Sequence, residues 1–184
     1  MTLRKFILVA GIGAALMALP SCLGDTEWEK TAEWRNANNK YVEEQRAKTE
    51  NGEKVFEMVS PTWQPTAYVL MQWHNDRSLT ADNLQPLYNS TVDVTYELRD
   101  INDEVVENSF SLTANGDSIF RCQPNSTVPG FAIALTNMHV GDSCTVIIPW
   151  QFAYGSQATS SLKAYSTLVY GLKLVGVPAY QKED

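Results

Sequence analysis

The chain has 184 residues, enough for one domain with a short tether. Its hydrophobic fraction of 44% and charged fraction of 19% exclude a disordered chain. Its net charge of −7, without a cluster of basic residues, argues against nucleic acid as a partner. Three cysteines and two histidines, widely scattered, are too few for a structural zinc site, and we therefore expect no bound metal.

Residues 1–21 have the pattern of a bacterial signal peptide. Arg4 and Lys5 precede an uncharged run over 6–18, which is shorter than the ~20 residues that a membrane-spanning helix needs. The Leu-Pro-Ser-Cys sequence that ends at Cys22 resembles a lipobox. We therefore expect cleavage before Cys22 and lipidation of its thiol. An ordinary secretory signal followed by an incidental cysteine is the alternative.

A lipid on Cys22 would anchor an otherwise soluble protein to a membrane. Leu23 follows this cysteine, in place of the aspartate that retains some lipoproteins in the inner membrane. We therefore expect a cell-envelope protein, anchored in the outer membrane of a Gram-negative bacterium.

Residues 22–58 are polar and are expected to form a lipid-anchored, partly helical tether. Thr26 and Glu29 have the spacing of a capping box, which predicts a helix over 27–48 with a thin apolar stripe. Asn51-Gly52 is expected to stop this helix. Two interpretations of this helix remain open. In the first, the helix has a functional role as a spacer or as a docking site for a partner. In the second, it only packs on the following domain or extends from the anchor.

From residue 59 to 184 the hydrophobic pattern becomes strand-like. Apolar and polar residues alternate over 91–99, and further strands are expected over 67–73, 118–122, 143–148 and about 167–177. One short helix interrupts them, because apolar residues from Phe131 to Met138 recur at helical spacing between Pro129 and Gly141. The predicted fold class is α+β, with a mainly antiparallel sheet of about five strands and one helix.

The second half of the chain contains a series of short motifs in a fixed order: Val94-x-Tyr96, Pro129-Gly130-Phe131, Met138-His139-Val140-Gly141-Asp142, Ile148-Pro149, Ala153-Tyr154-Gly155 and Ser166-Thr167-Leu168-Val169-Tyr170. In order and spacing these motifs resemble the FKBP-type peptidyl-prolyl cis-trans isomerases. The resemblance spans 91–177, about half of the chain, and implies an FKBP-like twisted sheet wrapped on the short helix. The helix expected over 27–48 would then be an N-terminal extension of this fold. An acidic domain of this type behind a lipobox is most like the lipoproteins of Bacteroidetes.

The resemblance implies a folding helper that isomerises proline-containing polypeptides outside the cytoplasm. Rotation about an Xaa-Pro bond crosses a barrier of ~18–20 kcal/mol that amide resonance creates. A dry aromatic pocket that favours the twisted amide is sufficient in principle, without metal, cofactor or covalent intermediate.

The family pattern also assigns roles to particular side chains. The Tyr154 hydroxyl would donate a hydrogen bond to a substrate carbonyl, and Phe131 would form the pocket floor. The resemblance implies catalytic roles for Tyr96, Glu107, Phe131, Tyr154 and Tyr170, and substrate contacts for Val106, Phe120, Val128 and Leu162.

Two positions depart from the family pattern. Val106-Glu107 replaces a Phe-Asp pair, and Lys163-Ala164-Tyr165 replaces a Pro-Pro pair before the last strand. Both changes loosen the expected proline pocket. The alternatives are therefore a non-catalytic FKBP-like binding module of the envelope with a degraded pocket, or a purely structural lipoprotein.

Cys122 and Cys144 could form a disulfide in an oxidising compartment. An FKBP-like topology would place their strands far apart, and this favours two buried thiols.

Overall fold

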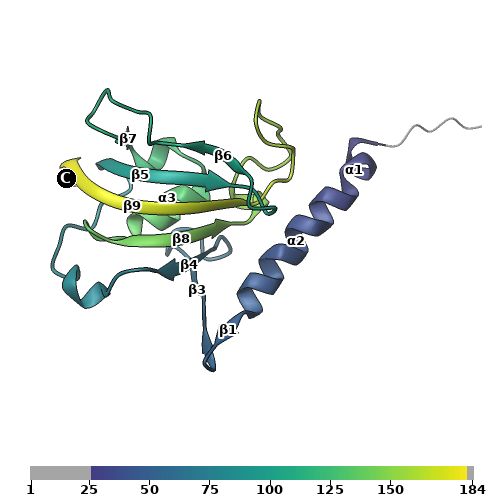
Figure 1. Cartoon of the computed structure of the whole chain (residues 1–184), viewed down its shortest axis with the longest axis horizontal. Coiled ribbons are helices and arrows are strands. Elements are labelled where there is room, and N and C mark those ends of the chain that lie inside the picture. Colours follow the sequence, from purple (N-terminus) through teal and green to yellow (C-terminus); the bar gives the residue numbers. More distant parts are fainter. Residues whose placement is uncertain (1–25, 182–184) are drawn as a thin grey trace, which may run out of the picture.

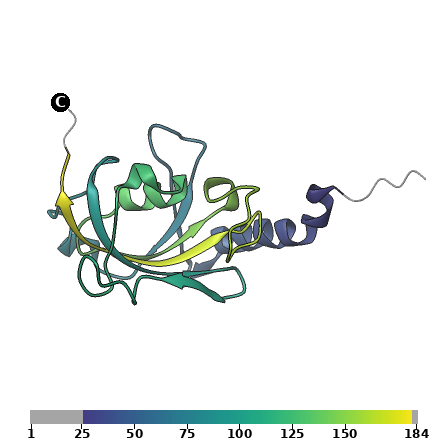
Figure 2. The same cartoon turned by 90° about the horizontal axis from the view of Figure 1, so that it is seen from above.

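In the computed structural model, which describes residues 26–181, a curved antiparallel sheet surrounds one helix, and a longer helix runs beside one end of the sheet (Figures 1 and 2). The predicted signal peptide and the lipidation site at Cys22 lie outside the described residues. Among the residues described, no helix is both long enough and apolar enough to cross a membrane.

The N-terminal segment is helical, as expected, but its helix is broken once. The Glu29 amide donates to the Thr26 hydroxyl at 3.3 Å, and the Thr26 amide donates to the Glu29 carboxylate at 2.7 Å. This capping box begins the short helix α1 (Glu27–Lys30), and α2 (Ala32–Ala47) follows after Thr31.

Asn51-Gly52 is the turn of a hairpin, and the prediction that it stops the helix is wrong. The helix ends at Ala47, and β1 (Thr49–Glu50) then pairs with β2 (Glu53–Lys54). Asn51 and Gly52 both have positive φ, 51° and 86°, as the commonest two-residue hairpin turn requires. Because every residue of the hairpin is exposed, no hydrophobic alternation indicated these strands.

Within residues 26–181 the main sheet has seven strands, two more than expected. Its order is β3-β4-β8-β9-β5-β6, β7 also pairs with β5, and every pairing is antiparallel. The two unexpected strands, β3 and β6, are the ends of this order. The strands are β3 (Glu57–Val59), β4 (Val69–Trp73), β5 (Thr91–Arg99), β6 (Val105–Asn108), β7 (Phe120–Cys122), β8 (Ser143–Ile148) and β9 (Leu168–Ala179).

The core lies between the concave face of the sheet and α3 (Pro129–Thr136), which Figure 2 shows inside the curve. Alternate residues of β5, from Val92 to Leu98, are buried, as its sequence pattern predicts. All residues of α3 from Gly130 to Leu135 are buried as well. The connections in the described part of the chain contain the short 3-10 helices η1 (Arg77–Leu79), η2 (Pro124–Ser126) and η3 (Trp150–Phe152).

Both cysteines of the described region are free thiols. Cys122 lies on β7 and Cys144 on β8, and the strands β5 and β9 separate them. Cys144 is buried as expected, whereas Cys122 is only partly buried, because β7 pairs with a single strand.

Candidate active site

A cavity of about 350 Å³ opens between the sheet, α3 and the η2 segment. Each wall of the cavity comes from a different part of the chain, so the cavity forms only when the whole domain is folded. Its lining is largely aromatic and consists of Tyr96, Glu107, Phe120, Ser126, Thr127, Val128, Phe131, Tyr154 and Tyr170.

Aromatic rings that contact one another line the inner wall of the cavity. Tyr96 on β5 and Tyr170 on β9 lie with ring centroids 5.6 Å apart, and Phe131 on α3 lies 4.9 Å from Tyr170. Phe120 on β7 meets the Tyr96 ring edge to face at 5.5 Å. Tyr96, Phe131 and Tyr170 are all at most 9% exposed, and their geometry is the one that aromatic pairs prefer. The wall is therefore preformed.

Polar groups stand at the rim of the cavity. The Tyr96 hydroxyl donates to the Glu107 carboxylate at 3.2 Å, and Glu107 carries the only charge among the lining residues of the described chain. Tyr154 lies in the turn after η3 and is 40% exposed. Its hydroxyl makes no hydrogen bond to any residue between 26 and 181, so it is available to a ligand.

The three tyrosines are neutral hydrogen-bond donors at physiological pH. Burial, and then the nearby carboxylate of Glu107, raise the pKa of Tyr96. Burial is also the main cause that raises the pKa of Tyr154 and of Tyr170. The site therefore offers apolar surface and uncharged donors.

Seven of the nine site residues expected from the sequence line this cavity. The other two do not: Leu162 is 8% exposed and belongs to the main core, and Val106 is partly buried against that core. Ser126 and Thr127 line the cavity but were not anticipated, because small polar residues before a helix are common in ordinary turns. Among residues 26–181, no group of three or more His, Cys, Asp or Glu side chains could hold a metal ion.

The comparisons with known proteins identify the class. Residues 83–175, half of the chain, match the sequence profile of the FKBP-type peptidyl-prolyl cis-trans isomerases, and the chain belongs to this family. A 58-residue segment is 38% identical to FK506-binding protein 3 of Candida albicans; it covers 32% of this chain and only 14% of that protein's length.

Solved structures share the fold. A peptidyl-prolyl cis-trans isomerase from Pseudomonas syringae pv. tomato has a TM-score of 0.63 at 20% identity, over 80% of this chain and 95% of that one. FkpA from Escherichia coli has a TM-score of 0.64 at 20% identity, over 83% and 62% of the two chains. The structure of the three FKBP domains of wheat FKBP73 has a TM-score of 0.53 at 18% identity, over 66% of this chain and 50% of that one. The α+β fold is therefore that of the FKBP-type isomerases.

Proposed function

We propose that this protein is a peptidyl-prolyl cis-trans isomerase that assists the folding of extracytoplasmic proteins. The observation that carries the proposal is the preformed aromatic wall of Tyr96, Phe131 and Tyr170 beside the Tyr154 hydroxyl, which has no hydrogen-bond partner among residues 26–181. Membership of the family supports it.

The mechanism needs no covalent bond to form or break. A proline ring of the substrate enters the cavity and packs on the Phe131 and Tyr170 rings. The twisted amide of the transition state has lost part of its charge separation, and a cavity that excludes water stabilises it relative to the planar ground state. Tyr154 donates a hydrogen bond to a substrate carbonyl, and Glu107 orients Tyr96 by accepting from its hydroxyl.

A second candidate function is peptide binding without turnover. It rests on Val106, which stands where the family has an aromatic residue and does not line the cavity. The wall on the β6 side then consists of the Glu107 carboxylate alone. Such a pocket would hold proline-containing chains but restrain the amide poorly.

Catalysed refolding of a protein whose slow step is prolyl isomerisation separates the two functions. We expect the wild-type protein to accelerate this step. We expect Tyr154→Phe to lower kcat/KM by up to roughly tenfold, because one hydrogen bond contributes about 0.5–1.5 kcal/mol and 1.36 kcal/mol corresponds to a factor of about ten in rate. The double variant Val106→Phe/Glu107→Asp should be more active than wild type. Binding of unfolded chains without acceleration, by both wild type and double variant, would leave only the binding module.

We also propose that a lipid on Cys22 holds this domain at the outer membrane, where its substrates are proline-containing polypeptides of the cell envelope. The lipobox over 19–22 and the short apolar run before it support this location. The excess of acidic over basic residues, 21 against 14, suits a soluble domain and not a polyanion-binding one.

A further inference from the structure

An aromatic cluster joins the N-terminal helices to the segment before β9. The Tyr165 ring meets Trp28 of α1 at 5.5 Å and Trp150 of η3 at 5.0 Å between centroids, both at an interplanar angle of 86°. The Arg35 guanidinium lies 3.2 Å from the Trp28 centroid and 5.2 Å from that of Tyr165. Arg35 is only 6% exposed, so its attraction to the rings is little screened by water. We call Trp28, Arg35, Trp150 and Tyr165 the aromatic clamp.

Hydrogen bonds from α2 hold the same region. The Trp34 indole donates to the Ser166 hydroxyl at 3.1 Å. The Thr167 amide donates to the Asn38 side-chain oxygen at 2.7 Å, and Asn38 is completely buried. Residues 34 and 38 are one helical turn apart and thus lie on one face of α2. This face is therefore attached to the domain by specific polar contacts.

The clamp fixes a strained backbone position. Tyr165 has a φ of 62°, in the left-handed region that a large aromatic residue rarely adopts. In this conformation its amide donates to the Gly155 carbonyl at 2.8 Å. The packing of the Tyr165 ring between two tryptophans opposes the cost of the backbone conformation.

The turn that carries Tyr154 is held at both of its ends by these contacts. Its first residue, Trp150, donates through the indole to the Asn39 side chain of α2 at 2.8 Å. Its last residue, Gly155, donates to the Trp150 carbonyl at 3.0 Å and accepts from Tyr165. Because the Tyr154 hydroxyl has no hydrogen-bond partner within residues 26–181, the turn sets where this side chain stands at the cavity.

We propose that the N-terminal helices position the prolyl pocket: the aromatic clamp holds Tyr165, and Tyr165 holds the turn that presents Tyr154 to the substrate. Tyr165 is a positioning residue, and α1 and α2 are part of the working site although none of their residues lines the cavity. This inference rests on the proposed isomerase function.

The test compares Tyr165→Ala with Tyr165→Phe, which keeps the ring and loses only a hydroxyl without a bonded partner in the described chain. We expect Tyr165→Ala to lower kcat/KM for a prolyl peptide by up to roughly tenfold, the loss expected when the Tyr154 hydrogen bond is removed altogether. Tyr165→Phe should keep wild-type activity. Trp28→Ala, which removes one face of the clamp from α1, should act in the same direction.

Two further readouts separate positioning from general weakening of the fold. In a Tyr154→Phe background, Tyr165→Ala should cost less than about twofold, because the group it positions is already gone. Hydrogen exchange should rise over residues 150–157 in Tyr165→Ala and stay unchanged in the core strand β9.

Each outcome decides one question. Equal losses of kcat/KM in both backgrounds, or unchanged exchange over 150–157, would overturn the positioning role. A wild-type protein without isomerase activity would overturn the proposed function alone, and the exchange comparison, repeated with Trp28→Ala, would then decide whether the clamp holds the turn.

Discussion

Gly130 lets α3 lie directly on β8, and this close approach places Phe131 at the cavity. A Cβ atom at Gly130 would overlap the Ile148 side chain. Ile148 is fully buried in the core and has no space into which to move. The glycine in the first turn of α3 is therefore a packing requirement of the site.

We expect Gly130→Ala to lower the free energy of unfolding by about 1–3 kcal/mol, the usual cost of overpacking a core. Substrate binding in the cavity should also weaken, because a displacement of α3 displaces Phe131. Gly171→Ala on β9 is the matched control: a Cβ there meets nothing within 4 Å. Denaturant unfolding of both variants measures the difference, and equal stabilities would contradict the packing argument.

Residue-level prediction succeeded where a side chain has one plausible environment. The alternation around Tyr96 indicates a half-buried strand, and the resemblance to the family pointed to the same tyrosine. Leu162 shows the limit: an apolar residue near a flap position can line a cavity or fill the core, and the structure places it in the core. Only packing distinguishes these cases.

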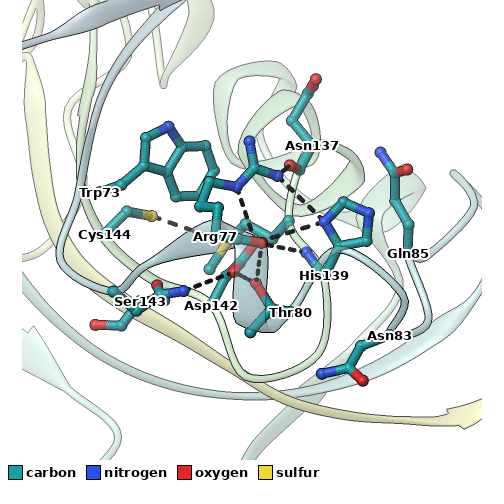
Figure 3. A network of polar contacts seen from close by, with 12 residues as sticks. Trp73, Arg77, Thr80, Asn83, Gln85, Asn137, His139, Asp142, Ser143 and Cys144 are labelled. Atoms are coloured by element: carbon teal, nitrogen blue, oxygen red, sulfur yellow. Dashed lines mark hydrogen bonds and ion pairs between the residues drawn. The ribbon is translucent and has the colours of Figure 1, made fainter.

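At the scale of elements, a polar network fastens the segment after β4 to the corner between α3 and β8 (Figure 3). The buried Asp142 carboxylate accepts hydrogen bonds from the Thr80 hydroxyl, from the His139 amide at 2.8 Å and from Asn75 at 3.0 Å. Arg77 lies 3.4 Å from the same carboxylate. Burial alone would raise the pKa of Asp142, but the hydrogen bonds and the Arg77 charge together hold this pKa below its usual range.

We expect Asp142→Asn to lower the free energy of unfolding by about 1–3 kcal/mol at neutral pH, because it leaves the groups around it with a poorer acceptor. A carboxyl whose pKa is lowered by folding stabilises the protein above its unfolded pKa of about 3.9, and loses this effect as the pH falls through the folded pKa. The difference in the free energy of unfolding between this variant and wild type should therefore shrink below about pH 4.

Asp82→Asn is the control, because Asp82 is an exposed carboxylate of the same segment. A difference that does not depend on pH would contradict the assignment.

Strands in which apolar and polar residues alternate clearly were predictable from the sequence, and strands without this alternation were not. β5 and β8 have the bounds expected from the sequence. β6 was missed because adjacent valines, Val105 and Val106, give no alternation, and Val105 is 49% exposed. β3 has three residues, of which two are exposed. Such edge strands form because a neighbour supplies hydrogen bonds, and the sequence alone does not show that neighbour.

At the scale of the molecule, the N-terminal helices connect the predicted lipid anchor to the domain. Val42 of α2 packs with Phe56, Leu70 and Ile147 in a small second core, and the aromatic clamp lies nearer the N-terminus. The segment was expected from its composition to be a tether. Packing of this helix on the following domain was one of the alternatives left open by the sequence, and the structure shows it. The particular contacts were not predictable, because the apolar stripe of the helix is thin and the partners of Trp34 and Asn38 lie more than 100 residues away.

The proposed lipid on Cys22 can be tested on the whole chain. Expressed in a Gram-negative host, the wild-type protein should fractionate with membranes and incorporate radiolabelled palmitate, since two or more acyl chains give stable anchoring. Cys22→Ser should lose the label and leave the membrane fraction, whereas Cys122→Ser should behave as wild type. Labelling that persists in Cys22→Ser would contradict the lipobox assignment.

The most direct test of the proposed isomerase is NMR exchange spectroscopy on a short Xaa-Pro peptide at a catalytic concentration of the protein. Uncatalysed interconversion takes on the order of 10–100 s at 25 °C. We predict cis–trans exchange peaks at mixing times below about 1 s, which weaken strongly with Tyr154→Phe. Peptide binding with an exchange rate equal to that of the peptide alone would contradict isomerase catalysis and leave a binding protein built on this fold.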